Sequence, residues 1–372
     1  MKIVFIHVGR YSLKIILAAL GLAGILYLLL FTSLGNNAFK PLIEKKLTDV
    51  FNTPITIDTF VFSHNALNLQ FHDASGNSVK VQGEFSLITL NLHALYHAKI
   101  VHNGGINTFG LPLKTSGSLN GGYGLMMMQG SANLFDGDVL YRAQFKHFHP
   151  SDMHVSIKNI DYHRLMQWLE YPHQSSTLLS GEVDLHGMNR RDIQGEVTLR
   201  TRTQNFSPSQ LVDDNSSFDF LSLFTDDQGK IQPFHLNLTL NASVDELGIL
   251  EQFAMLPLRG SANLNTTIQG DQDRLVLDAK SNIAHSFTHA RVHWKKLRPS
   301  YLYVDMKHAD ANTLFHLFSN KSPAQGSISL NVESISDAIH YRGSFASKLT
   351  HLNFDNTTTH ESMLNDLLKA IP

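Results

Sequence analysis

The segment Phe234–Leu240, FHLNLTL, carries the pattern on which the fold prediction depends: apolar residues alternate with polar ones at every second position. Successive side chains of a β-strand point to opposite faces, so such a strand has one apolar and one polar face. The same period of two recurs in Leu67–Phe71, Val79–Leu87, Val139–Phe145, Val183–Leu185, Val197–Leu199, Leu275–Ala279 and Ile328–Val332. Gly, Asn, Asp or Ser residues separate these runs. The sequence therefore predicts a mainly β protein built from antiparallel strands.

The N-terminal part of the chain contains one long apolar run. Ile15–Phe31 reads IILAALGLAGILYLLLF, and no charged residue occurs between Lys14 and Lys40. About 20 apolar residues in a helix cross the hydrocarbon core of a bilayer, so residues 15–34 are predicted to form a single-pass transmembrane signal-anchor helix. Positive charges before this run predict a cytoplasmic N-terminus, residues 1–14, and a periplasmic location for the remainder. The alternative is a cleaved signal peptide, for which the run is long and SLGNNAF is a poor cleavage site.

Residues 37–52, NAFKPLIEKKLTDVFN, are predicted to form a short amphipathic helix. Apolar residues recur in it at spacings of three and four, at Phe39, Leu42, Ile43, Leu47, Val50 and Phe51. Pro41 is compatible with the first turn of such a helix, because the N–H that proline lacks would be unbonded there. Asn52, followed by Thr53 and Pro54, is a helix stop signal.

Three stretches of the chain repeat one arrangement, in which a strand ends, an Asp precedes a short apolar segment, and a glycine-led strand follows. The Asp residues are Asp161, Asp245 and Asp310, and the glycines are Gly181, Gly260 and Gly326. Each Asp is expected to cap a short helix. We therefore divide residues 55–372 into blocks of about 55–150, 151–230, 231–300 and 301–355, followed by a short C-terminal helix at 360–370. The expected fold is an elongated, curled antiparallel sheet with short linking helices, whose apolar face is covered by a second sheet, by its own curl, or by an apolar ligand in a groove.

Two segments near the N-terminus resemble a known family. Phe39–Leu47, FKPLIEKKL, followed by Pro54–Asp58, PITID, is similar to the start of AsmA-like proteins, in which such a helix leads into the first strand. The repeated blocks also resemble those of this family of inner-membrane-anchored envelope proteins of Gram-negative bacteria, which includes AsmA and TamB. The resemblance implies a long β-groove lined with apolar side chains and a role in envelope lipid homeostasis, by moving phospholipid between the membranes. The chain departs from the family in length, because a groove that crosses the periplasm would need more repeats.

Composition and motifs argue against several classes of function. The chain has no cysteine, which excludes disulfides, thiolate metal sites and cysteine nucleophiles. Its net charge of -2, with 30 scattered Lys and Arg residues, argues against a nucleic-acid partner. Among the 21 histidines, His93 with His97 and His147 with His149 and His154 are close in sequence, but neither group has the ligand pattern of a zinc enzyme. No Gly-x-Ser-x-Gly motif supports a serine hydrolase. We therefore expect no catalytic residue, no metal site and no cofactor.

The function that these features favour is non-enzymatic lipid handling at the inner membrane, with membrane phospholipids and other envelope proteins as partners. The residues expected to line the lipid groove are Leu236, Leu238, Leu240, Leu275, Leu277, Ile328, Leu330 and Val332, which share one face within each strand. The alternative for the same residues is a closed, dry core. Met126–Met128 likewise has two interpretations, as core filling or as an adaptable apolar lining. The alternative function is a structural or assembly factor for outer-membrane proteins, which would offer a sheet edge to a client.

Overall fold

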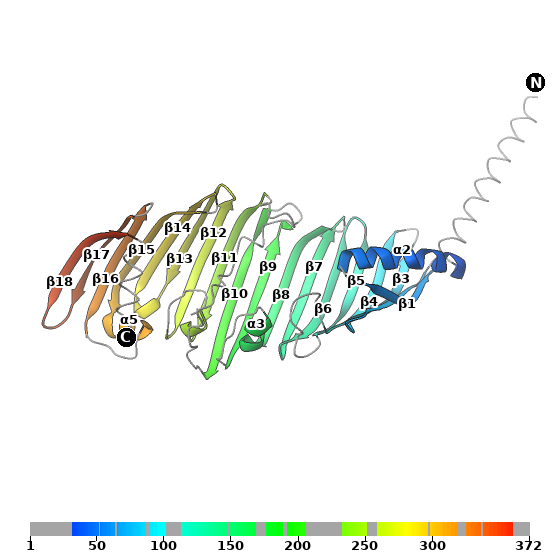
Figure 1. Cartoon of the computed structure of the whole chain (residues 1–372), viewed down its shortest axis with the longest axis horizontal. Helices are drawn as coiled ribbons and strands as arrows, with labels where there is room; N and C mark the ends of the chain where they lie inside the picture. Colours follow the sequence, from blue (N-terminus) through cyan, green and yellow to red (C-terminus); the bar gives the residue numbers. More distant parts are fainter. Residues whose placement is uncertain are drawn as a thin grey trace, which may run out of the picture. The chain divides into compact units, whose positions relative to one another are not determined.

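The computed structural model describes residues 32–51, 53–63, 65–86, 89–101, 113–147, 149–168, 176–188, 192–205, 233–250, 259–296, 298–318, 325–335 and 338–359. The chain forms two compact units, unit 1 with Met1–Asn133 and Phe145–Phe148, and unit 2 with Leu134–Gln144 and His149–Pro372. Strands dominate both units (Figure 1), so the prediction of a mainly β protein is confirmed. Residues 1–31, which hold most of the predicted transmembrane segment 15–34, and the predicted helix 360–370 lie outside the described residues. None of the helices in the described ranges has the length and apolar character needed to cross a membrane.

Unit 1 is an antiparallel sheet bordered by one helix. Its elements are α2 (Ser33–Phe51), β1 (Ile55–Phe62), β2 (Leu67–Asp73), β3 (Ser78–Ser86), β4 (Asn91–Ile100), β5 (Leu113–Gly122) and β6 (Met126–Leu134). Each strand pairs with the next strand along the chain. Apolar residues of successive strands are in register, as in Phe71 opposite Val79 and Val81 opposite Tyr96, so this sheet also has one apolar face. Met126 and Met128 share that face in β6, and both are half-buried.

Helix α2 begins four residues before the predicted start at residue 37, and Pro41 therefore lies inside the helix rather than in its first turn. The additional turn is stabilised from outside the segment. The Asn36 side-chain oxygen accepts a hydrogen bond from the Phe62 N–H of β1 at 3.2 Å, and Asn36 is buried. This contact joins residues 26 positions apart, so local spacing could not indicate it. Of the apolar residues expected on one helix face, Leu42 is exposed, whereas Phe39, Ile43 and Leu47 are half-buried.

Unit 2 is a longer series of strands linked by short helices. The strands are β7 (Gly137–Lys146), β8 (His149–Asp161), β9 (Ser176–His186), β10 (Asp192–Asn205), β11 (His235–Val244), β12 (Ala262–Asp271), β13 (Arg274–Ser281), β14 (Phe287–Lys295), β15 (Arg298–Asp310), β16 (Ser327–Ile335), β17 (Ala338–Ala346) and β18 (His351–Thr359). The helices are α3 (Tyr162–Trp168), η3 (Leu247–Leu250), η4 (Ile283–His285) and α5 (Ala311–Phe318). From β8 to β18 each strand pairs with its sequence neighbour.

One strand pair departs from the expected antiparallel arrangement. Strands β10 and β11 run parallel, with Gly195 opposite Leu238 and Val197 opposite Leu240. Parallel neighbours cannot be joined by a tight hairpin, because the chain must return to the end where the first strand began. The long stretch between β10 and β11 has the length for that return. The alternation in Phe234–Leu240 specifies which side chains share a face, but it does not specify strand direction.

The repeated Asp–helix–strand arrangement is present, with one change. Asp161 accepts the Arg164 N–H at 3.3 Å, and Asp310 accepts both the N–H and the hydroxyl of Thr313 at 2.7 Å, so these two residues cap their helices as predicted. The prediction is wrong for Asp245. Its carboxylate accepts instead from Thr201 and Thr203 of β10, and Glu246 accepts the Gly248 N–H at 3.1 Å. A long-range partner therefore displaced the local cap.

Glycine is required at the three repeat positions for different structural reasons. Gly260 lies two residues before β12 and Gly326 lies directly before β16. Their C=O groups accept the N–H groups of Leu247 and Ala311 at 2.6 and 2.9 Å. Gly260 has φ of +86°, which favours glycine. Gly181, which was expected to begin a strand, lies inside β9. A Cβ there would be 2.2 Å from the Thr198 carbonyl oxygen, so close strand approach is the reason for this glycine.

Candidate functional site

The sheet of unit 2 carries rows of apolar side chains that cross successive strands. Residues directly opposite each other on neighbouring strands point to the same face. One such row contains Leu185, Gly195, Leu238, Ile268, Leu277, Val292 and Leu302. The next row contains Val183, Val197, Leu240, Thr266, Ala279, Ala290, Val304, Val332 and Tyr341. We call the face that holds these rows the apolar face, and the opposite one the polar face.

All eight residues predicted to line a groove lie on the apolar face. They belong to three strands that are not adjacent: β11 supplies three residues, β13 two and β16 three. The rows through β12, β14 and β15 connect them. The structure therefore brings together on one face residues that the sequence could assign to a face only within each strand.

The eight residues differ in burial. Leu236, Leu275 and Val332 are 1%, 5% and 7% exposed, whereas Leu238, Leu240, Leu277, Ile328 and Leu330 are half-buried. Leu236 and Leu275 pack with Phe234 in a small cluster that Trp294, Ile193, Leu238 and Ile268 border. The apolar face thus combines side chains packed as a core with side chains that keep part of their surface accessible.

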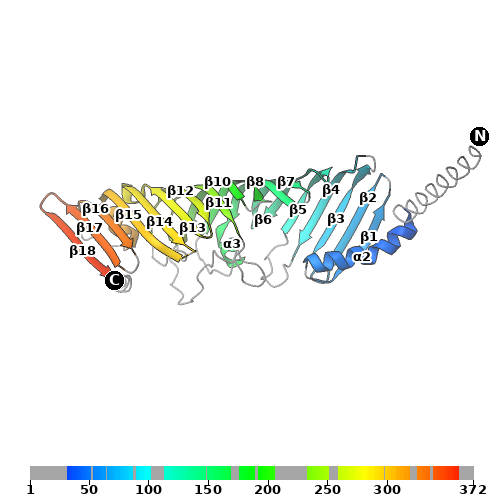
Figure 2. The same ribbon diagram turned by 90° about the horizontal axis from the view of Figure 1, so that it is seen from above.

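Short helices close the apolar face at one end of the strands. α3 and α5 lie at the same end of the strands (Figure 1), and α3 projects from one face of the sheet (Figure 2). The helix residues Met166, Leu247, Ala284 and Leu317 form a buried cluster with the strand residues Val244, Ala262 and Ala309. Tyr162 of α3 donates its hydroxyl to the Ile249 carbonyl at 2.9 Å, and burial raises the pKa of Tyr162, so the hydroxyl stays protonated. These contacts give the apolar face one sealed border.

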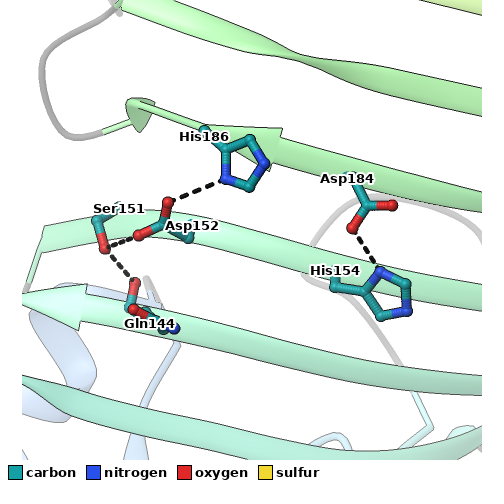
Figure 3. Close-up of polar contacts among 6 residues, drawn as sticks. All are labelled: Gln144, Ser151, Asp152, His154, Asp184 and His186. Atoms are coloured by element: carbon teal, nitrogen blue, oxygen red, sulfur yellow. Dashed lines mark hydrogen bonds and ion pairs between the residues drawn. The ribbon is translucent and has the colours of Figure 1, made fainter.

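The polar face carries histidine–aspartate pairs between neighbouring strands (Figure 3). His186 Nδ1 lies 3.0 Å from Asp152, and on the same two strands His154 pairs with Asp184. Further pairs with 3.0 Å separations are His235–Asp192, between β11 and β10, and His289–Asp278, between β14 and β13. In the two pairs between β8 and β9 the partners lie directly opposite each other, an arrangement that stabilises antiparallel strands when the histidine is protonated.

A signal for the pairs in Figure 3 was present in the sequence. Residues 152–154 read Asp-Met-His and residues 184–186 read Asp-Leu-His. In the register of β8 with β9, each Asp of one triplet lies opposite the His of the other. From the sequence, His154 was weighed only as a possible metal ligand, and His186 was not singled out. Two Asp-x-His triplets aligned in opposite directions place each Asp opposite a His, which is the signal for this arrangement.

Asp278 has the most elaborate electrostatic environment on the polar face. His289 Nε2 lies 3.0 Å from both carboxylate oxygens, and Arg291 donates two hydrogen bonds at 2.8 and 2.6 Å. Partial burial raises the pKa of Asp278, but these hydrogen bonds and charges outweigh it and hold the pKa below its usual value. Asp278 therefore remains ionised and links two strands of the sheet.

The histidines do not converge in the part of the chain that is described. His93 contacts Asn120 at 3.2 Å, and the ring of His147 stacks edge-on against Tyr123. His154 is paired with Asp184. Across the described ranges, no three His, Asp or Glu side chains are arranged to hold a metal ion.

Two shallow hollows lie on the polar side of unit 2. One, of about 470 Å³, is lined by side chains of β10–β14 that include Asn241, Asn265 and Lys280. The other, of about 510 Å³, is lined by side chains of β15–β18 that include Asp305 and Arg342. Both hollows lie on the face opposite the apolar rows, and each exposes more apolar than polar surface.

Comparison with family models, with curated proteins and with solved structures produced no match to this chain. The arguments for function therefore come from the sequence and from the geometry of the two faces.

Proposed function

We propose that this chain is an inner-membrane-anchored periplasmic protein whose apolar sheet face binds phospholipid acyl chains, and that it acts in phospholipid transport or outer-membrane lipid homeostasis without catalysing a reaction. The observation that carries the proposal is the set of apolar rows that cross β9–β15 in register. Five of the predicted lining residues are only half-buried, which supports a face with room for a ligand.

The physical basis of binding is transfer of hydrocarbon from water to the apolar face. Each buried methylene contributes about 0.8 kcal/mol, so one acyl chain supplies enough energy for binding without any covalent step. The charged headgroup stays in water, because burying it without a partner is costly. An apolar run at residues 15–34 would hold the protein at the membrane from which the lipid is taken.

Site-specific photo-crosslinking in intact cells tests this proposal. A photoreactive phenylalanine analogue at Leu238 is expected to form adducts with phospholipid, which mass spectrometry of the purified full-length chain would identify. The matched control places the same analogue at Asn237, the preceding residue of β11, which is exposed on the polar face. Equal lipid labelling at both positions, or none at Leu238, would contradict the proposal.

A charge substitution distinguishes lipid binding from core packing. In a lipid-binding face, Leu238→Glu should reduce bound phospholipid while the melting temperature of the full chain changes little. In a closed core the same glutamate would lack a partner and cost several kcal/mol, enough to unfold a marginal unit. Asn237→Glu is the control and should leave both quantities unchanged. Unfolding of the Leu238→Glu variant without prior lipid loss would favour the core.

A further inference from the structure

The last strand of unit 2 has a free edge. β18 pairs with β17 through all nine of its residues, and no other strand of the described ranges pairs with β18. Its residues from His351 to Thr357 are exposed. On the apolar face, Leu352 and Phe354 are 56% and 38% exposed. Unpaired backbone groups and exposed apolar side chains on one strand form a template for another strand.

The hairpin between β17 and β18 determines which backbone groups point outward. Ser347 donates its N–H to the Thr350 carbonyl at 2.8 Å, so these two residues form a hydrogen-bonded pair. Such pairs alternate with non-bonded pairs along an antiparallel ladder. Leu352 and Phe354 therefore bond to β17, whereas His351, Asn353 and Asp355 direct their N–H and C=O groups to the open edge. Consistent with this pattern, the Thr357 N–H bonds to the Asn356 side chain at 2.8 Å rather than to a strand.

Within the described residues, β18 lacks several of the features that protect edge strands, although it carries one acidic residue, Asp355. Proteins block edges with proline, lysine, bulges or a covering element. β18 contains no proline, lysine or arginine, and its register with β17 has no bulge. Phe354 also lies against Gly343, where an added Cβ would be 2.4 Å from its ring, so the aromatic side chain covers this glycine. The edge is therefore regular over its full length.

We propose that two copies of this chain pair through β18, antiparallel and about a two-fold axis at Asn353. In this register Asn353 lies opposite itself, His351 opposite Asp355 of the second copy, and Leu352 opposite Phe354 of the second copy. The outward-pointing backbone groups of His351, Asn353 and Asp355 then meet as hydrogen-bonded pairs. Faces also match, because residues directly opposite each other share a face.

Charge complementarity selects a second copy and this register. The new His351–Asp355 contact repeats the antiparallel cross-strand pairing that the polar face already uses in His186–Asp152 and His154–Asp184. A shift that centres the axis on Asp355 would place two carboxylates opposite each other, which is destabilising. Asp355 can make the new contact because its side chain is 69% exposed. Its present ion pair with His340 is long, at 3.9 Å, and is therefore weak. This proposal does not depend on the lipid function.

Analytical ultracentrifugation of the detergent-solubilised full chain tests the association. The wild-type chain should show a concentration-dependent dimer. Asn353→Pro removes an outward N–H without touching the bonds to β17, and it should weaken dimerisation at least tenfold. His351→Asp should weaken it similarly by placing like charges opposite each other, and the double variant His351→Asp with Asp355→His should restore it. A wild-type monomer at all concentrations, or a double variant as weak as the single one, would overturn the proposal.

The absence of native cysteine allows the register to be measured directly. Asn353→Cys should form a disulfide-linked dimer on mild oxidation, because the two cysteines face each other within bonding range. Asp355→Cys is the matched control and should remain uncrosslinked, because residue 355 lies opposite residue 351. Faster crosslinking at 355 than at 353 would reject this register. Dimerisation only after removal of residues 360–372 would reject the proposal and would identify that segment as the cover of the edge. A stoichiometric complex with another protein at β18 would also reject it, in favour of a strand from that protein.

Discussion

The two terminal strands of the described chain, β1 in unit 1 and β18 in unit 2, meet the same physical requirement in opposite ways. The outer edge of β1 is covered by α2: Ile57 donates its N–H to Glu44 at 2.9 Å, and Ile55 donates to Thr48 at 3.1 Å. β18 has no comparable cover in the part of the chain that is described. Backbone N–H groups need partners, so an edge is either satisfied by its own chain or left for water and other strands. Within the described residues, the first edge is thus covered by its own chain and the last edge is not.

The largest loss of stability is expected from removing the buried Ile57 side chain of β1. Ile57 is 1% exposed, so Ile57→Ala should destabilise unit 1 by about 3 kcal/mol through lost burial and a residual cavity. Leu352→Ala on the open edge should cost less than about 1 kcal/mol, because Leu352 is 56% exposed. Hydrogen exchange followed by mass spectrometry can report each unit separately in the full chain. Equal losses of protection would show that the two edges are equally packed.

The hydrogen bond from the Ile57 N–H to Glu44 of α2 should contribute less to the stability of unit 1 than the packing of the Ile57 side chain does. Glu44→Ala leaves the Ile57 N–H without its acceptor and should cost about 1–2 kcal/mol, measured as faster exchange of the β1 amides. Glu44→Gln keeps an acceptor oxygen and should recover most of the loss. Lys45→Ala changes an exposed neighbour on the same helix and serves as the control. If Glu44→Ala leaves exchange in β1 unchanged, α2 does not protect this edge.

Charge pairs on a central strand and on the edge strand should also differ in how much they stabilise the fold. Asp278 is 22% exposed and holds two partners, so Asp278→Asn should cost about 1 kcal/mol at pH 7, measured by thermal unfolding. The pKa of Asp278 is lowered in the folded protein, so its contribution is present above the unfolded-state pKa of about 3.9 and is lost as pH falls through the lower folded value. The difference between wild type and Asp278→Asn should therefore disappear at strongly acidic pH. Asp355→Asn, on an exposed pair, should change the monomer little at any pH; a difference for Asp278→Asn that grows below pH 4 would contradict this assignment.

The smallest effect on monomer stability is expected at the open edge. Asn353→Pro should change the unfolding free energy by less than about 1 kcal/mol when measured at a concentration where the chain is monomeric. Proline is tolerated in an edge strand where the missing N–H faces solvent. Leu352→Pro, one residue earlier, removes an N–H that bonds to β17 and should cost several times more. Similar losses of stability in the two proline variants would show that the Asn353 N–H does not point to the open edge.

Much of the fold could be predicted because strand periodicity is a local property. The alternation in Phe234–Leu240 assigns faces to β11 without any knowledge of its neighbours, and the same reasoning placed Leu277 and Leu330 correctly within their strands. The helix caps at Asp161 and Asp310 were also predictable, since a cap contacts residues only three positions away. Prediction failed where a distant residue competed for the same group. Asp245 bonds to Thr201 and Thr203, more than 40 positions earlier, in place of the expected local cap.

The candidate site divides in the same way. The sequence identified the eight apolar residues, but their common face depends on the pairings through β12, β14 and β15, and no residue pattern specifies which strands will be neighbours. The Asp-x-His triplets at 152–154 and 184–186 were visible, yet their meaning depended on a register that was unknown. The burial of Leu236 and Leu275, in contrast to half-buried Leu238, depends on how Phe234 and Trp294 pack over one end of the face.

By itself, the sequence determined the strand-rich class, the side of each strand that is apolar, the absence of thiol chemistry and the apolar run at residues 15–34, because each of these depends on composition or on spacings within one segment. Only the tertiary structure decided that β10 and β11 run parallel, that α2 covers β1, that histidines and aspartates pair across strands, and that β18 pairs on one side only among the described strands. These features depend on contacts between residues tens of positions apart. The free energy of such a contact exists only after the backbone has brought both partners together, so no local pattern could specify it.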